Sequence, residues 1–556
     1  MSTEPKDELA ESVIERFGEL KDDRADAEPN WKNIIKFLNL SRYNFDRTKT
    51  KGQALGTDVY NGQPIAALNL FKNGVNGYSF NPTTKWFGFE INDPPGLDDI
   101  PAVRFWLDSL EDIFRKTFLR SNFYSSISPF IRDGGAMGTA YEWVENNVYG
   151  DNIVYKVLHT GECYIDQNAN CQIDTFFRSF ELTARAAVEY FGADNLSNKI
   201  IEAAEKSSSD RFEFVHGVFP NKDRNIELPN NLNMKWASIY CEVGEGQTVK
   251  TGGFTSFPAV TWRFEHGSDE VYGRGPGHYS IIDAATLNLI SKDLIRASHM
   301  AVQPPMNVPV EAKGHERFGP RGINYFSDPQ KTAHPVITGV NYPVGIEREQ
   351  KMEAIIRQHW HVDLFLMLQQ AEREMTATEI LERMGEKVAV LAPILSGLYD
   401  DAVDKIFDRT WDILVEGRKI PPPPPEVIQF GGTIKVNKLG PLAQAQKRLW
   451  EGGSIQKALL DSTTLIQLKP EVLDKINGDD ALTRIFQSHG VPQSTLVDNE
   501  QVAAVRQHRA QLAEAQQQAE IAKTGTEAVR NASQANAIGG NGLTEALAEG
   551  AQAIPQ

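Results

Sequence analysis

The sequence predicts an α+β protein assembled from several packed regions, and three observations indicate this fold class. Apolar residues recur at helical spacing through most of the first 120 residues. Between about residues 136 and 264 the period changes to two, which is typical of half-buried strands. Long helical segments then return and enclose a proline-rich module. With 556 residues, of which 41% are hydrophobic and 24% charged, the chain is long enough for about two to four packed regions.

The first part of the chain is expected to hold four amphipathic helices. The first has an apolar stripe formed by Leu9, Val13, Ile14, Phe17 and Leu20. A second follows Pro29, a third begins near Pro64, and a fourth begins at Pro101, because proline suits the first helical turn. The stripe of the fourth comprises Val103, Phe105, Trp106, Leu110, Ile113, Phe114 and Phe118. Residues 86–91 are predicted to form a strand. The predicted core tryptophans are Trp31, Trp86, Trp106 and Trp143.

A β-rich segment follows. Short strands are predicted over residues 139–147, 152–158, 161–166, 174–182, 212–220, 235–243 and 257–265. One helical segment, residues 183–206, interrupts them. Helices followed by a sheet-rich segment give the first half of the chain its α+β character.

The second half is predicted to contain three long helices. The first, residues 279–301, spans roughly 35 Å at about 1.5 Å per residue, and its apolar side is formed by Ile282, Leu287, Ile290, Leu294 and Ile295. Residues 302–345 hold seven prolines and are expected to form an extended, loop-rich or edge-strand module. The second helix runs from about residue 345 to 369. The third, from about residue 376 to 417, is kinked at Pro393.

The C-terminal part changes composition several times. Five prolines at 421–425 predict a stiff polyproline spacer, and residues 426–437 predict one or two strands. Another helical block is expected from 441 to about 490. From about 497 the chain is rich in glutamine and alanine and can be helical. Past about residue 532, its glycine, asparagine, alanine and serine residues cannot bury enough surface to become ordered.

The acidic net charge argues against tight binding of nucleic acid. The formal net charge is −17, and no run of lysine and arginine exceeds two residues. A protein that holds DNA through phosphates should be basic at the contact, so DNA is either absent or loosely held. An acidic wall would let DNA slide, but acidity for solubility alone is the more common explanation of such a charge.

The compartment is indicated by the cysteines and the N-terminus. Cys163, Cys171 and Cys241 lack CxxC spacing and are expected to be buried, reduced thiols. The polar, acidic start does not resemble a signal peptide, and no apolar run approaches the roughly 18 residues of a membrane span. We therefore expect a protein made in a cytoplasm, without a membrane partner.

Three glycine-rich segments, 134–140, 271–277 and 430–436, invite a phosphate-loop interpretation. None ends in Gly-Lys-Ser/Thr, and none has GxGxxG between a strand and a helix. Turns at the entry to long helices explain them better, so no cofactor is expected.

His359, His361 and Asp363 form the one cluster that resembles a metal site. In a helix, positions two apart point about 200° apart and cannot share an ion. His359 and Asp363 are four apart and are expected to form an ordinary surface pair. No GxSxG occurs, so no catalytic or metal residue is predicted. A metal- or nucleotide-dependent DNA-processing enzyme remains the alternative, supported only by His359, Asp363 and the glycine-rich turns.

The layout of the second half is the most informative feature. Two long helices bracket a proline-rich module, and a polar loop joins the second helix to a kinked one. Such a plan suits a subunit that packs side by side in a ring, with the helix pair as the wall, because repeated head-to-tail contacts close rings.

Five segments, in order, resemble the portal (head-to-tail connector) family of short-tailed bacteriophages. They are residues 15–46, 65–91 with its Trp-Phe strand, 120–145 with SNFY…GTA, 269–309 with DEVYGRGPGHYS, and 375–414 with MTATEILER. Together they cover nearly the whole chain, and each occurs at a fitting spacing.

The resemblance implies a portal fold of named regions. These are an α/β wing (1–270), a first stem helix (271–301), a clip (302–345), a second stem helix (346–368), a tunnel loop (369–378), a kinked wing helix with strands (379–440), a crown (441–496), and a barrel helix with a disordered tail (497–556). It also implies a ring of about twelve subunits at one capsid vertex of the virion, assembled in the host cytoplasm. A third, weaker alternative is an internal virion scaffold without a channel.

The implied partners are double-stranded DNA passing without sequence specificity, the terminase, capsid and scaffolding proteins, and a tail adaptor. The side chains expected to face the channel are Glu372, Arg373, Glu374, Arg348, Lys351 and Arg357. The side chains expected to make clip contacts are Lys313, Arg317, Arg321 and Lys331.

Overall fold

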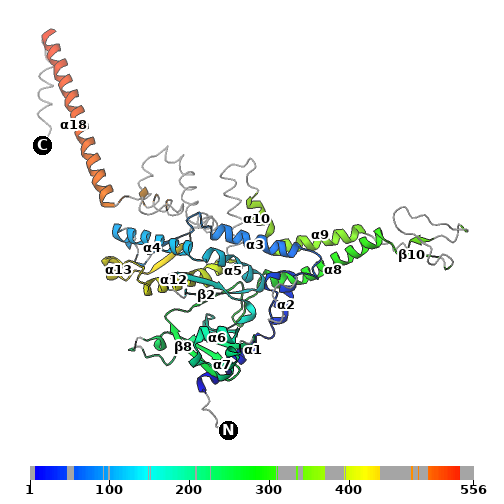
Figure 1. The fold of residues 1–556 in the computed structure, drawn as a ribbon. Helices are drawn as coiled ribbons and strands as arrows, with labels where there is room; N and C mark the ends of the chain where they lie inside the picture. The colour runs from blue at the N-terminus through cyan, green and yellow to red at the C-terminus, as the bar shows by residue number, and fades with distance from the viewer. Residues whose placement is uncertain are drawn as a thin grey trace. The chain divides into compact units, whose positions relative to one another are not determined.

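The computed structural model describes residues 7–46, 55–308, 342–369, 393–438 and 497–538 apart from short gaps, together with a few isolated residues between these ranges. The chain divides into two units. The first comprises Met1–Glu90, Ser109–Pro422 and Ile434–Gly490, and the second comprises Ile91–Asp108, Pro423–Thr433 and Val491–Gln556. Figure 1 labels the helices and strands. Among the described residues, no helix is long and apolar enough to cross a membrane.

The expected N-terminal helices are confirmed. They are α1 (Glu8–Arg24), α2 (Glu28–Phe37), α3 (Gln63–Ser79) and α4 (Pro101–Arg120), and α5 (Phe123–Met137) follows directly. Asp7 caps α1, since its carboxylate accepts a hydrogen bond of 3.1 Å from the Ala10 backbone N–H. The predicted stripes contain two errors, because Leu9 and Phe105 are 44% and 75% exposed.

An aromatic core fills the first unit. Trp86 stacks on Phe123 with ring centroids 5.9 Å apart, and Phe407 from a distant helix stacks on Phe114 at 5.4 Å. All four tryptophans predicted to be core are at most 6% exposed, which confirms their assignment. Rings packed edge-to-face or offset in this way add to the stability that their burial provides.

Two antiparallel sheets make up most of the β-rich segment. The three-stranded sheet has the order β3-β2-β9, with β2 (Thr139–Asn146) between β3 (Ile153–Val157) and β9 (Ala259–Arg263). The five-stranded sheet runs in sequence order through β4 (Cys163–Gln167), β5 (Ile173–Thr183), β6 (Arg211–Pro220), β7 (Trp236–Glu242) and β8 (Gln247–Phe254). Strand β8 was not predicted, because QTVKTGGF has little apolar alternation.

Helices cover the five-stranded sheet. Val13, Phe17 and Leu20 of α1 share a buried cluster with Val215 and Ile239 of the sheet. The helical structure predicted over 183–206 is confirmed, and it consists of two helices, α6 (Ala184–Phe191) and α7 (Asn198–Glu205). Gly192 has a φ of +84°, and this left-handed backbone ends α6.

The last described elements of the first unit are a helix and a strand. A π-helical turn (Tyr399–Val403) leads into α12 (Asp404–Glu416), and β12 (Ile434–Lys438) pairs with β1 (Phe87–Ile91). The helix preceding residue 393 and the crown region 441–477 lie outside the described residues.

The second unit contains α13 (Pro425–Phe430) and α18 (Asn499–Ile538). The prediction of one or two strands over 426–437 holds for one strand, β12. The first part of that range is helical instead: proline at the first helical turn starts α13, and Gly431 with a φ of +68° ends it. The glutamine- and alanine-rich helix is confirmed, but it continues past residue 532, where order was expected to end.

The three cysteines are free thiols. Cys163 and Cys241 are buried, and burial raises the pKa of Cys241 to about 12, so both are inert. The prediction is wrong for Cys171, which is half-buried in a turn with a φ of +57°.

Candidate functional site

The two long helices of the second half pack side by side (Figure 1). They are α8 (Pro276–Val302) and α9 (Tyr342–His359), so the first predicted long helix is confirmed. At about 1.5 Å per residue, the 27 residues of α8 extend about 40 Å. Past the end of α8, β10 (Met306–Asn307) pairs antiparallel with β11 (His334–Pro335), which agrees with the edge-strand structure predicted there.

At the start of α8, the main chain packs directly against the main chain at the end of α5 and the start of β2. The glycine-rich segments 134–140 and 271–277 pack on each other, and Thr139 Oγ1 accepts a hydrogen bond of 2.9 Å from the Gly273 N–H. A Cβ on Gly277 would lie 2.0 Å from the Ala136 carbonyl oxygen, and one on Gly138, whose φ is +73°, would lie 2.2 Å from the Gly273 carbonyl oxygen. The glycines thus serve close packing, as the turn interpretation predicted for these two segments.

A polar cluster ties a distant loop to both helices. We call Asn61, Ser291, Glu349 and Glu353 the Asn61 clamp. The Asn61 amide nitrogen lies 3.1 Å from Ser291 Oγ on α8, and 3.2 and 3.1 Å from the Glu349 and Glu353 carboxylates on α9. Ser291 Oγ also donates to Glu349. Because Ser291 is only 4% exposed, these bonds are shielded from water and fix the two helices against each other.

The same loop makes a second contact with α8. The Asn288 side chain donates to the Asp58 carbonyl at 2.9 Å and accepts from the Tyr60 N–H at 2.6 Å. Sequence reasoning missed the loop and the clamp entirely.

The second predicted long helix is wrong as a single element. Helix α9 ends at His359, His361 takes a φ of +50°, and α10 (Val362–Gln369) follows. The rings of Trp360 and Phe365 both contact Phe71 of α3, at 5.5 and 6.2 Å between centroids. On a continuous helix these two residues would point about 140° apart, so the break lets both pack on one neighbour.

The residues of the metal-like cluster have other partners. His359 lies 3.3 Å from Asp283 on α8, and Asp363 lies 3.1 Å from Arg357. The predicted surface pair between His359 and Asp363 is therefore wrong. Across the described ranges, no group of three or more histidine, cysteine, aspartate or glutamate side chains could hold a metal ion. His359 and Asp363, on which the metal-dependent alternative was based, therefore do not pair with each other.

The charged residues expected to face a channel are only partly described. Arg348 and Lys351 are exposed on α9, and Arg357 is half-buried. The helix pair α8–α9 carries five acidic and five basic side chains, so it is formally neutral. The other predicted site residues lie outside the described residues: Glu372, Arg373, Glu374, Lys313, Arg317, Arg321 and Lys331.

An apolar strip remains uncovered along α8. Tyr279, Ile282 and Leu289 are 50%, 73% and 59% exposed, and their spacing places them on one face. Ile282 and Ile295, predicted to lie on the buried side, are exposed, whereas Leu287 is buried as expected. A row of large apolar side chains in contact with water is typical of a surface that another protein covers.

Comparisons with known proteins give a consistent result. The sequence matches the family described as bacteriophage head to tail connecting protein over residues 10–497. It is 27% identical over 548 residues to a probable portal protein of Bordetella phage BPP-1, which covers 96% of this chain and 97% of that protein. It is 26% identical over 565 residues to the portal protein of Salmonella phage epsilon15, which covers 98% of this chain and 99% of that protein.

Proposed function

This chain belongs to the bacteriophage head to tail connecting proteins, and from that membership we propose that about twelve copies form a ring around a channel for double-stranded DNA. The family is a structural one, of capsid-associated connectors. The single observation that supports the ring most directly is the helix pair α8–α9, which is anchored firmly at its base and leaves Tyr279, Ile282 and Leu289 uncovered. A neighbouring subunit would cover them.

The regions take the roles that the resemblance implies. The helices within 271–301 and 346–368 form the stem around the channel, and 302–345 forms the clip at its end. Residues 369–378 form the tunnel loop, where Glu372, Arg373 and Glu374 constrict the channel. The wing comprises 1–270 and 379–440, the crown 441–496, and α18 lies in the region of the barrel.

The charge of the protein suits a conduit. In a ring of about twelve chains, each chain adds its net charge of −17, so the ring as a whole is strongly acidic. The helix pair has equal numbers of acidic and basic side chains and therefore no excess of positive charge to bind phosphates. DNA therefore slides through without being held and without its sequence being read. The clip side chains Lys313, Arg317, Arg321 and Lys331 supply positive charge for docking the terminase during packaging and the tail adaptor afterwards.

Imaging and mass measurement test the ring. Purified protein examined by negative-stain microscopy and native mass spectrometry should show closed rings with a central hole. Monomers or dimers that persist across salt and protein concentration would refute the proposal.

A deletion tests the clip assignment. Removing residues 310–340 should abolish binding of the terminase or the tail adaptor while rings still form. Unchanged docking by intact rings would contradict the clip assignment and leave the ring itself untouched.

A further inference from the structure

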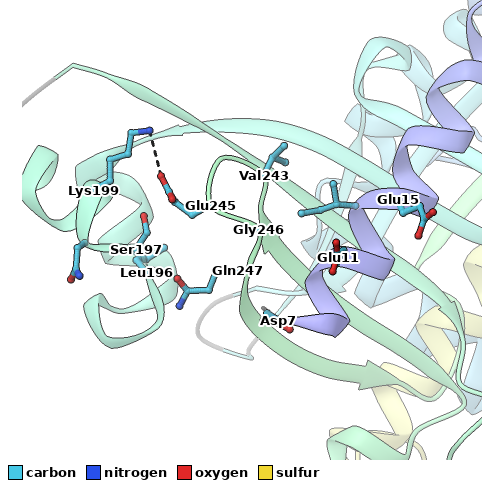
Figure 2. Close-up of a pocket in the computed structure, with 12 residues that line it drawn as sticks. Asp7, Glu11, Glu15, Leu196, Ser197, Lys199, Val243, Glu245, Gly246 and Gln247 are labelled. Carbon is cyan, nitrogen blue, oxygen red and sulfur yellow. Dashed lines mark ion pairs between the residues drawn. The ribbon is translucent and has the colours of Figure 1, made fainter. Parts of the chain in front are cut away.

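The five-stranded sheet carries two exposed features at opposite ends of β7. Residues 221–235, here called the arm, connect β6 to β7 and precede Trp236. A hollow, here called the groove, lies between α1, the start of α7 and the β7–β8 turn that follows Glu242 (Figure 2). Seven residues of β7 separate them, a distance of about 20 Å at about 3.4 Å per residue. The arm therefore cannot reach the groove of its own chain.

Side-chain hydrogen bonds order part of the arm, and two of its leucines are exposed. The Asn221 side chain donates to the Leu232 carbonyl at 2.8 Å, and the Asn230 side chain accepts from the Asn233 N–H at 3.1 Å. Leu228 and Leu232 are nevertheless 54% and 58% exposed. A loop that is ordered by its own hydrogen bonds loses little entropy when it binds, so exposed leucines on it are suited to docking.

The groove is lined by both apolar and acidic side chains. Its volume is about 1180 Å³, and Ile14, Leu196 and Val243 contribute its apolar surface. Glu11 and Glu15 project from α1 on one side, and Glu245 from the β7–β8 turn on the other, where it pairs with Lys199 at 3.5 Å (Figure 2).

Asp7 fixes one wall of the groove. It accepts a hydrogen bond from the Ala10 N–H of α1 at 3.1 Å and one from the Thr248 N–H of β8 at 2.8 Å. Because this carboxylate ties the helix to the sheet, it holds the α1 wall of the groove in place.

The two features complement each other in polarity and charge. The arm carries Lys222, Arg224 and Lys235 against Asp223 and Glu227, an excess of one positive charge. The groove has the four carboxylates described above against Lys199, an excess of three negative charges. The two exposed leucines of the arm match the apolar side chains of the groove in kind.

We propose that the arm of one subunit inserts Leu228 and Leu232 into the groove of the next subunit, with Lys222 and Arg224 beside Glu11 and Glu15. This inference rests on the proposed ring. The two surfaces differ and lie at opposite ends of one sheet, so their contact is head-to-tail. Head-to-tail contacts close rings, whereas a two-fold dimer uses the same surface on both subunits.

Cross-linking tests the contact directly. In a Cys171→Ser background, Asn231→Cys marks the arm and Asn198→Cys marks the groove, and both positions are exposed. With a short bis-maleimide, the doubly substituted chain should give a ladder of covalent oligomers. A mixture of the two singly substituted chains should give dimers only, and each single variant alone should give none, because like surfaces do not meet.

A charge exchange provides a second readout. Reversing Glu11 and Glu15 to lysine, or Lys222 and Arg224 to glutamate, should raise the protein concentration needed for rings about tenfold. Combining the two reversals should restore it. Glu189→Lys, an exposed substitution on α6, is the control and should leave assembly unchanged.

The two proposals fail in distinguishable ways. If the unmodified chain forms no rings in native mass spectrometry, the proposed function itself fails. If rings form but the doubly substituted chain gives no ladder, or the charge reversals leave assembly unchanged, the arm–groove contact is refuted and the ring stands. The latter result would assign the groove to another occupant, such as a basic segment of a capsid protein.

Discussion

Replacing Glu142 by glutamine should change how stability depends on pH. Glu142 lies on the central strand β2 of the three-stranded sheet, is 1% exposed, and has no hydrogen-bond partner for either carboxylate oxygen. Ser126 Oγ, on the neighbouring helix α5, donates instead to the Phe123 carbonyl at 2.9 Å. Burial without compensation disfavours the charged form and raises the pKa of Glu142 from 4.5 to about 7.

The sign and the size of this change in stability with pH follow from proton linkage. Below pH 4.5 the carboxyl is protonated in both the folded and the unfolded chain, and the folded state incurs no penalty. As pH rises toward 7, the unfolded chain releases the proton while the folded chain keeps it, so stability falls. The difference between 4.5 and about 7, at about 1.4 kcal/mol per pH unit, amounts to about 3 kcal/mol above pH 7. Glutamine cannot ionise, so Glu142→Gln removes this loss.

The assay is urea unfolding of the wild type and Glu142→Gln at pH 5, 6, 7 and 8. The free energy of unfolding of the variant, relative to the wild type, should increase by about 3 kcal/mol between pH 5 and 8. The difference between the two chains cancels the contributions of other titrating groups. Glu181→Gln, at an exposed position of β5, serves as the matched control, and its difference should change with pH much less than that of Glu142→Gln, because an exposed carboxylate stays hydrated. A flat difference for Glu142→Gln would refute the argument, as would one that falls with pH.

Three further substitutions test the packing. Arg24→Met should lower the free energy of unfolding by about 3 kcal/mol in urea titrations, because this 2% exposed guanidinium donates to three backbone carbonyls and makes the shorter of the two ion pairs of Glu28. A lysine at this position should not restore the stability. Asn61→Ala should cost about 1–3 kcal/mol locally, seen as faster hydrogen exchange in α9 but not in β2; equal acceleration in both would contradict the clamp. Gly277→Ala should destabilise the protein by about 3 kcal/mol in thermal melts, because the added Cβ would lie 2.0 Å from a carbonyl oxygen. Gly18→Ala, whose added Cβ would have nothing within 4 Å, is the control and should be neutral or slightly stabilising. Equal effects of the two glycine changes would refute the close-packing argument.

Elements with local signals could be predicted from the sequence. Proline in the first turn marks the starts of α2, α3 and α4, and alternation marks β2 and β6. Helix α13 had such signals as well, a proline at its start and Gly431 at its end, but the residues between them, EVIQF, favoured a strand.

Features that depend on distant contacts could not be predicted. The break after α9 exists because Trp360 and Phe365 both pack on Phe71, nearly 300 positions earlier in the chain. Asn61 meets Ser291 across 230 residues, and an asparagine in a polar loop gives no sign of such a partner. The exposure of Ile282 is likewise set by which neighbours α8 has, not by its own stripe.

The glycine contact at the start of α8 limits how this protein can change. At most packed positions a larger side chain can be accommodated when a second substitution makes the facing side chain smaller. The atoms that face Gly138 and Gly277 belong to main-chain carbonyls, and these are the same in every amino acid. No second-site substitution can therefore make room there. Sequences that keep the long helix at this angle must therefore keep these two glycines.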